Sequence, residues 1–301
     1  MMNLMIELTN RCTLRCPTCF SHQDGRVKKD MGMSDFRRII DESNGLIDSI
    51  SLYNYGEPLL NGKLLEMILY AKMKGVRFIK VATNAMQLTP AKAKKIILAG
   101  LDYISISMDG ATPDTYKQFR KGGRFETVVA HTRELVKLRN TLRGRLKIEI
   151  QFIIMRHNEH EIEAIEKLAQ ELGVDRLRLK TVLIKKDLWR HLLPRNERFS
   201  RYAPQTKSTR CFKPTKELVV NGDGTVIPCC YIVEKDVEKF KMGNIFEQSL
   251  EEILNSEKYK SFVEKCTTDK SQLSSCKDCE EGNLSLDYGV IDVANGRKVA
   301  R

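Results

Sequence analysis

Three cysteines near the start of the chain, Cys12, Cys16 and Cys19, have the spacing C-x3-C-x2-C. Thiolates are soft ligands that suit iron, and three of them on one short loop can bind three irons of a cubane [4Fe–4S] cluster. The fourth iron is then left for another ligand. A structural zinc ion is the alternative, but zinc sites normally have four protein ligands, and residues 12–19 contain no His and no fourth Cys. The spacing therefore favours an iron–sulfur cluster with one open position.

A second set of cysteines lies in the last third of the chain. Cys211, Gly224 and Cys229 have the spacing C-x12-G-x4-C, and Cys276 and Cys279 form a C-x2-C pair. Four thiolates can close a second [4Fe–4S] cluster completely, so that no iron stays open. A zinc ribbon with four cysteine ligands has the same pattern and is the alternative.

Two of the nine cysteines, Cys230 and Cys266, fall outside both sets. We expect each to be a buried small side chain, with an additional ligand or a hydrogen donor to a substrate radical as alternatives. Nine cysteines would predict disulfides in a secreted protein, whereas a reducing compartment leaves them available for metals or catalysis. The first residues lack the features of a signal peptide, and no apolar run reaches the length of about 18 residues that a membrane span needs. We therefore predict a cytoplasmic protein.

Polar residues follow three of the predicted strands at the point where each strand ends. In a parallel sheet such positions share one edge, where α/β folds bind ligands. A glycine there permits close approach of the backbone, and a carboxylate can pair with a cation. A plain turn is the alternative for such residues. The candidate cofactor-binding residues are Tyr55, Gly56, Glu57, Thr83, Asn84, Ser107 and Asp109.

These side chains need a scaffold of alternating strands and helices. Up to about residue 185, short Ile- and Val-rich runs alternate with longer segments of helical period, which predicts β–α units around a parallel sheet. The six predicted strands are Leu4–Leu8, Ser49–Tyr53, Phe78–Thr83, Tyr103–Met108, Ile148–Met155 and Arg176–Thr181. The predicted helices are Met33–Ile47, Leu64–Lys74, Pro90–Ala99, Pro113–Arg120, Arg124–Arg139 and His160–Leu172, with Ser34, Thr89 and Thr112 among the caps.

The last third of the chain has a different pattern. Residues 217–220 and 225–228 flank a turn-rich segment and predict a β-hairpin, and a helix is expected over Ser249–Cys266. The predicted fold is α/β, with a partial (β/α)6 TIM-like barrel and a small C-terminal α+β domain. The expected boundaries are residues 1–185 for the barrel, 186–204 for a linker, 205–286 for the cluster domain and 287–301 for a tail that is either flexible or packs back as a strand.

The two cysteine patterns, in this order on a β/α chain, resemble the radical S-adenosylmethionine (SAM) superfamily with a C-terminal SPASM or twitch domain. Met242-Gly243-Asn244-Ile245 is also typical of that domain. The resemblance implies a catalytic [4Fe–4S] cluster, which binds S-adenosylmethionine at its open iron, on Cys12, Cys16 and Cys19. It also implies an auxiliary [4Fe–4S] cluster on Cys211, Cys229, Cys276 and Cys279. The shorter twitch arrangement fits better, because no cysteine follows Cys279.

The resemblance also implies roles for the polar residues. Tyr55-Gly56-Glu57 stands where the family has a Gly-Gly-Glu motif that receives the methionine ammonium. Thr83, Asn84, Ser107 and Asp109 stand where the family has polar residues near the ribose and the methionine carboxylate. Thr18 departs from the aromatic residue usual before the third cysteine, which concerns adenine packing. Arg120–Phe125 and the pair Asn158 and Glu161 resemble further recurring segments, with an exposed helix end and an exposed cap as the alternative readings.

The resemblance implies a 5′-deoxyadenosyl radical that abstracts a hydrogen atom from the substrate, with electrons from an external donor such as flavodoxin or ferredoxin. An auxiliary cluster can then accept one electron, and loss of a proton completes a dehydrogenation. The string YGEPLL at residues 55–60 resembles twitch dehydrogenases that act on aminocyclitols. We therefore expect a radical SAM oxidoreductase that oxidises a small polar metabolite such as an aminocyclitol or sugar.

Three alternatives stay open. One is a ribosomal-peptide maturase that forms a crosslink, a thioether or an epimer, although we expect no leader-binding module ahead of Cys12. Another is a redox-neutral radical reaction on a sugar, nucleotide or lipid. The third is a non-catalytic zinc- or RNA-binding protein in which the net charge of +12 is functional. The Lys and Arg residues are scattered, which favours solvated helix faces and makes nucleic acid an unexpected partner.

Overall fold

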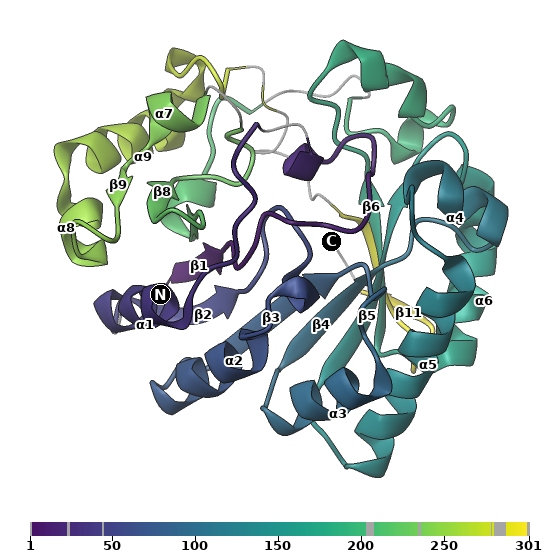
Figure 1. Cartoon of the computed structure of the whole chain (residues 1–301). Helices are drawn as coiled ribbons and strands as arrows, with labels where there is room; N and C mark the ends of the chain where they lie inside the picture. The colour runs from purple at the N-terminus through teal and green to yellow at the C-terminus, as the bar shows by residue number, and fades with distance from the viewer. Residues whose placement is uncertain are drawn as a thin grey trace. The chain divides into compact units, whose positions relative to one another are not determined.

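The computed structural model describes residues 2–22, 25–43, 45–202, 208–233, 236–277, 279 and 287–299. The chain forms two compact units, each assembled from separate stretches of sequence (Figure 1). The first unit comprises Met1–Cys12, Phe20–Val81 and Thr206–Asn283, and the second comprises Thr13–Cys19, Ala82–Gln205 and Leu284–Arg301. The N-terminal strands and the second cysteine set therefore belong to the same unit.

The sheet of the first unit combines parallel strands from the start of the chain with a C-terminal antiparallel ribbon. Its strands are β1 (Met2–Ile6), β2 (Ile47–Ser51), β3 (Phe78–Thr83, which continues into the second unit), β7 (Glu217–Val220), β8 (Thr225–Ile227) and β9 (Gly243–Asn244), in the order β3-β2-β1-β7-β8-β9. Strand β1 pairs in parallel with both β2 and β7, so that Leu4 faces Ile50 on one side and Leu218 on the other. All three of these side chains are buried, as expected for a central strand.

Helices of the first unit connect these strands or follow the ribbon. They are α1 (Met33–Glu42), α2 (Leu64–Met73), α7 (Asp236–Phe240), α8 (Leu250–Asn255) and α9 (Glu257–Asp269), with 3-10 turns η1 (Phe20–His22), η2 (Pro58–Leu60), η6 (Lys213–Thr215) and η7 (Lys270–Gln272). Figure 1 shows α8 and α9 beside the short strand β9. Helix α9 also contacts η6 and η7, which brings Cys266 close to the segments that carry the other C-terminal cysteines.

The second unit continues the alternation of strands and helices. Its strands are β4 (Tyr103–Ser107), β5 (Lys147–Ile154), β6 (Arg176–Thr181), β10 (Asp287–Asp292) and β11 (Arg297–Val299), in the order β11-β10-β6-β5-β4. Its helices are α3 (Pro90–Leu98), α4 (Pro113–Phe119), α5 (Phe125–Thr141) and α6 (Ile162–Leu172), with 3-10 turns η3 (Glu159–Glu161), η4 (Asp187–Leu192) and η5 (Glu197–Phe199). Strands β4, β5 and β6 are parallel, and β10 pairs with β6 in the antiparallel sense. Residues 287–299 thus include a strand that packs back, one of the two possibilities left open by the sequence.

The predicted α/β class is confirmed, and most elements differ from their predicted bounds by only one or two residues. Thr89 and Thr112 cap α3 and α4 through their side chains. Ser34 was predicted wrongly as a cap, because it lies inside α1 and Gly32 is the cap residue. Helix α1 also ends at Glu42, before Ile47 begins β2. The helix predicted over Ser249–Cys266 is two helices, because Ser256 ends α8 with extended backbone and caps α9.

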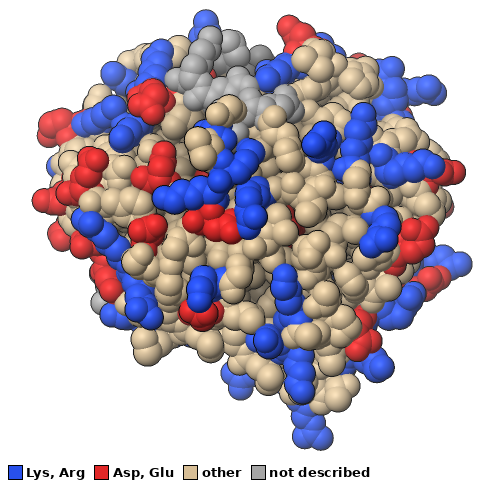
Figure 2. Space-filling view, viewed as in Figure 1, with Lys and Arg blue, Asp and Glu red and all other residues tan. Residues whose placement is uncertain are grey.

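Basic and acidic side chains are interspersed over the face of the molecule seen in Figure 2. Several form ion pairs within one unit, such as Arg139 with Asp175 at 2.5 Å. Within the described part of the chain, every helix is too short or too polar to cross a membrane.

Candidate functional site

In the first unit, the segment after β2 packs directly against the residues that precede Cys12. Gly56 has φ of +92°, and a Cβ atom there would lie 2.9 Å from the carbonyl oxygen of Arg11 and closer still to that of Thr9. The amide of Glu57 donates to the same Arg11 carbonyl at 2.7 Å. Only glycine permits this approach at a positive φ. The predicted Tyr55-Gly56-Glu57 motif is therefore in contact with the start of the cysteine loop.

Tyr55 connects this motif with two other parts of the first unit. Its ring meets Phe20 edge to face, with ring centroids 5.8 Å apart. Its hydroxyl donates to the backbone carbonyl of Cys230 at 3.4 Å. Glu57 is buried and accepts from the amide of Leu59 at 3.0 Å, so its carboxylate also begins the turn η2. The segment that follows β2 thus contacts Phe20, the residue after Cys19, and also the C-terminal segment that contains Cys230.

A buried ion pair that the sequence analysis missed lies at the end of β1. Glu7 is only 1% exposed, and its two carboxylate oxygens accept from the guanidinium of Arg26 at 2.7 and 2.8 Å. Glu7 also accepts from the amide of Gly222 in the turn after β7, at 3.2 Å. The sequence does show an acidic residue, Glu7, directly after an apolar strand, but no local pattern identifies Arg26 and Gly222 as its partners.

In the second unit, Arg120 connects Cys16 with Asp109. Its Nη1 donates to Cys16 Sγ at 3.7 Å, and its Nε donates to Asp109 Oδ2 at 2.5 Å. Burial raises the pKa of the Cys16 thiol, whereas the positive charge of Arg120 opposes that rise. Burial alone would lower the pKa of Arg120, but the carboxylate of Asp109 raises it. The segment of Arg120 is therefore not an exposed helix end.

Asp109 is fully buried, and its three oxygen atoms all have hydrogen-bond partners within the second unit. Oδ1 accepts from the amide of Ile153 at 2.7 Å, and the carbonyl accepts from Asn158 Nδ2 at 3.1 Å. Glu161 accepts from the amide of Ala111 at 2.8 Å. Asn158 and Glu161 are buried as well, so the reading of an exposed cap is wrong for both. They fix the loop after β4 that carries Asp109.

Thr83, Asn84 and Ser107 also lie at the ends of their strands in the second unit. Thr83 Oγ1 accepts from the amide of Ala85, and Asn84 Oδ1 accepts from the amide of Met86, both at 2.9 Å. Ala85 has a positive φ of 58°, unusual for a residue with a Cβ. Thr83 and Asn84 therefore hold a tight turn, in addition to any part they take in a ligand site. Ser107 is the last residue of β4 and is partly buried.

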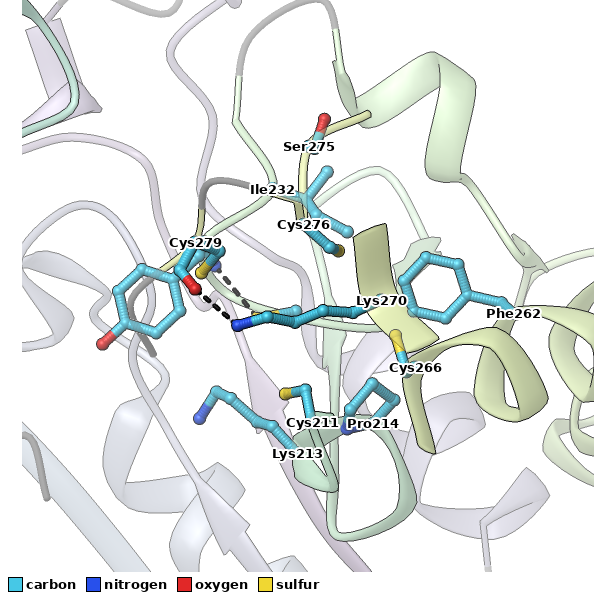
Figure 3. A pocket seen from close by; sticks show the side chains of 12 residues that line it. Cys211, Lys213, Pro214, Ile232, Phe262, Cys266, Lys270, Ser275, Cys276 and Cys279 are labelled. Carbon is cyan, nitrogen blue, oxygen red and sulfur yellow. Dashed lines mark hydrogen bonds between the residues drawn. The ribbon is translucent and has the colours of Figure 1, made fainter. Parts of the chain in front are cut away.

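The C-terminal cysteines converge on one cavity within the first unit. Five of them, four as predicted and Cys266 in addition, line this cavity together with Lys213 and Lys270 (Figure 3). Backbone hydrogen bonds hold the arrangement, from Cys211 N to Cys266 O at 2.6 Å and from Cys279 N to Cys276 O at 3.0 Å. The cysteines that line the cavity are Cys211, Cys229, Cys266, Cys276 and Cys279. Cys266 is buried as expected, but its place in this cavity was not predicted.

The thiols of this cavity interact with one another. A hydrogen bond with Cys276 and burial both raise the pKa of Cys266, and burial raises the pKa of Cys211. Cys229 has a raised pKa because its thiol hydrogen-bonds with Cys230 and is buried. The protein alone therefore favours the neutral thiol at Cys211, Cys229 and Cys266. A metal that binds them must displace their protons.

Two lysines bring positive charge to the same cavity. Lys270 is only 3% exposed, and its Nζ donates to the carbonyl of Cys279 at 2.6 Å, the bond drawn in Figure 3. Lys213 Nζ pairs with Glu217 Oε1 at 2.9 Å. Burial alone would lower the pKa of Lys213, but the neighbouring Cys230 and Glu217 raise it. Cationic groups of this kind suit a cavity that is to hold thiolates.

The fit of these residues to a metal group depends on their donor chemistry. Thiols from separate segments around one cavity are the ligand set that a closed iron–sulfur cluster needs. Among the described residues, no three His, Cys, Asp or Glu side chains form a group that is already arranged to hold a single metal ion. All nine cysteines are free of disulfides. The C-terminal set therefore fits a cluster by its donors.

Two family models match the chain. The Radical SAM superfamily matches residues 6–169, and the iron–sulfur cluster-binding domain SPASM matches residues 211–280. A relative from Pyrococcus furiosus, the tungsten-containing aldehyde ferredoxin oxidoreductase cofactor-modifying protein, is 25% identical over 92% of this chain and 86% of its own length.

Two solved structures have a similar fold. BtrN in complex with AdoMet and 2-DOIA is 18% identical, with 92% of each chain covered and a TM-score of 0.59. Streptococcus suis SuiB bound to the precursor peptide SuiA is 16% identical, with 93% of this chain and 71% of that chain covered and a TM-score of 0.69. Identities this low establish a common fold.

The close contact at Gly56 predicts a large loss of stability on Gly56→Ala. Alanine must adopt a positive φ and must also push its Cβ against backbone oxygens, which together should lower the free energy of unfolding by about 3 kcal/mol. Gly75 is the matched control, because its φ is +85° and a Cβ there would meet no atom within 4 Å. Gly75→Ala should lower the same quantity by only about 1 kcal/mol. Urea unfolding followed by circular dichroism measures both, and equal losses would contradict the close contact.

Proposed function

Because this chain belongs to the radical SAM superfamily and carries an iron–sulfur cluster-binding SPASM domain, we propose that it dehydrogenates an alcohol of a small polar metabolite such as an aminocyclitol or sugar. The cofactors of this class are a [4Fe–4S] cluster, S-adenosylmethionine and auxiliary iron–sulfur centres. When bound, the first cluster supplies an electron that cleaves S-adenosylmethionine, and the resulting 5′-deoxyadenosyl radical takes a hydrogen atom from the substrate. Cys12, Cys16 and Cys19 would hold it.

The observation that carries the oxidative assignment is the convergence of Cys211, Cys229, Cys276 and Cys279 on one cavity. Four thiolates would close a cubane completely, so this group would have no iron open to substrate and would serve as a one-electron acceptor. The balance is that of an alcohol oxidation. The carbon loses a hydrogen atom to the adenosyl radical, the hydroxyl loses a proton, and one electron leaves to the acceptor as the C=O bond forms.

The remaining residues of the chain would bind and orient S-adenosylmethionine. Gly56 lets the motif after β2 approach the backbone just before Cys12, and we assign Glu57 to the methionine ammonium. Thr83, Asn84 and Ser107 would lie near the ribose and the carboxylate. Asp109 would act indirectly, because both of its carboxylate oxygens already accept hydrogen bonds from Arg120 and Ile153.

A peptide substrate is the second candidate. It is supported by the fold shared with SuiB, whose structure contains a precursor peptide. If the reaction on the peptide is an epimerisation, Cys230 or Cys266 would be the candidate hydrogen donor, and the auxiliary cluster would not need to accept electrons from the substrate. A redox-neutral reaction on a sugar, nucleotide or lipid would likewise not need the auxiliary cluster to accept electrons from the substrate. In each case an external donor of the flavodoxin or ferredoxin type would reduce the catalytic cluster.

Metal analysis tests the two ligand sets. Anaerobically reconstituted wild type should contain about eight irons, as two cubanes require. Replacing Cys12, Cys16 and Cys19 with alanine should leave about four, and so should replacing Cys211, Cys229, Cys276 and Cys279. Iron, sulfide and zinc assays with electron paramagnetic resonance (EPR) measure this. The opposite result would be four irons in wild type, none in the variant that lacks Cys12, Cys16 and Cys19, and zinc bound by the C-terminal cysteines. The protein would then have no auxiliary electron acceptor, and the oxidative proposal would be wrong.

Product analysis tests the reaction. Incubation with 2-deoxy-scyllo-inosamine and related aminocyclitols should give one ketone for each 5′-deoxyadenosine, because one hydrogen atom is abstracted per two-electron oxidation. Mass spectrometry of both products measures the ratio. Formation of 5′-deoxyadenosine with a product of unchanged oxidation state, and no reduction of the auxiliary cluster, would favour the redox-neutral candidate instead.

The buried ammonium of Lys270 should favour reduction of the auxiliary cluster, because a nearby cation stabilises the added negative charge. In the variant that lacks Cys12, Cys16 and Cys19, the further change Lys270→Met should move the midpoint potential to more negative values. Lys265→Met is the control, because Lys265 is exposed and lies on helix α9, which ends directly before Lys270. Equal midpoints for the two lysine variants in an EPR-monitored titration would contradict this role.

A further inference from the structure

The segment that follows α4 contacts the N-terminal cysteine loop at three points within the second unit. The amide of Arg15 donates to the carbonyl of Lys121 at 2.9 Å. Gly122 has φ of +90°, and a Cβ there would lie 3.3 Å from the carbonyl of Thr13. The third contact is the hydrogen bond from Arg120 to the sulfur of Cys16 at 3.7 Å. The loop between Thr13 and Cys16 is therefore supported along its backbone and at its cysteine.

Arg120 is itself held rigidly. Its side chain is only 13% exposed, and its Nε pairs with Asp109, which is fully buried. Asp109 is fixed in turn by the amide of Ile153 on β5 and by Asn158. A buried guanidinium with a buried counterion keeps its position, because moving either group leaves an unpaired charge. Cys16 thus meets a donor whose position is set by the ends of β4 and β5.

The chemistry of this donor matters once Cys16 is a metal ligand. Arginine remains charged at any pH a protein experiences, so it still donates when Cys16 is a thiolate. Hydrogen bonds to ligand sulfur and nearby positive charge both stabilise the more negative, reduced form of an iron–sulfur cluster. The pair with Asp109 orients the guanidinium, and a second N–H remains directed at the sulfur.

We propose that Arg120 is a positioning residue that holds Cys16 in its ligand geometry and raises the reduction potential of the N-terminal cluster. This inference rests on the proposed role of Cys12, Cys16 and Cys19 as ligands. It assigns a function to a segment whose role the sequence left open. It also gives the buried Asp109 a role in the site that is independent of direct contact with S-adenosylmethionine.

The test compares Arg120→Met with Arg124→Met in the reconstituted full-length protein. Arg124 is the matched control, because it is an exposed arginine four positions further along the same segment. The measured quantity is the midpoint potential of the EPR signal that changes when S-adenosylmethionine is added, since only a cluster with an open iron responds. Iron content and circular dichroism are measured on the same samples.

Arg120→Met should keep about eight irons and should lower the midpoint potential of the N-terminal cluster. We expect a shift of at least about 59 mV, which for one electron corresponds to a tenfold smaller equilibrium constant for reduction. Arg124→Met should match wild type. Loss of only the N-terminal irons, with unchanged circular dichroism, would also support positioning, and Arg120→Lys should then restore part of the iron because it keeps the charge.

An unshifted midpoint, or unfolding of both Arg120 variants with loss of all iron, would overturn the proposal. Failure of the ligand assignment itself is distinct, because wild type would then lack a signal that responds to S-adenosylmethionine.

Discussion

The parallel pairing of β7 with β1 is the constraint on which the position of the C-terminal cysteines depends. Lys216 and Val220 accept from the amides of Asn3 and Glu7, each at 2.9 Å. Because β1, β2 and β7 run in the same direction, the residues after each strand gather at one edge of the sheet of the first unit. Glu7, Tyr55 and Gly222 all lie there, and their contacts join the start of the cysteine loop to the segment of Cys230.

Buried ion pairs at strand ends are the second organising feature. Glu7 with Arg26 in the first unit and Asp109 with Arg120 in the second each place a carboxylate at a strand end and an arginine on a loop. Burial of such charges costs desolvation energy, and they persist where each oxygen has a donor. Both carboxylates meet this condition through additional backbone amides. Loops that would otherwise be free to move are in this way tied to the sheet.

The sequence predicted the parts of this structure that depend on local pattern. Strand positions followed from runs of Ile and Val, and Thr89 and Thr112 were recognised as caps because a cap bonds three residues ahead. Ser34 had the same local signal, and the outcome differed because the helix begins at Met33, so that Gly32 takes the cap position two residues earlier. The contact of Arg120 with Cys16 could not be predicted, because the two residues lie 104 positions apart in sequence. The two cysteine sets were recognisable from the short, regular spacings of the cysteines within each segment.

The place of β1 between two partners has a consequence for how the protein is made. Asn3 bonds to Glu217 across a separation of 214 residues, so one side of the first strand has no neighbour until most of the chain has left the ribosome. Contacts of such long range close late and slow folding. Until then, an apolar strand with unpaired amides is a surface on which nascent chains can associate. Synthesis at low temperature or with abundant chaperones should therefore improve the yield of folded protein before any metal is supplied.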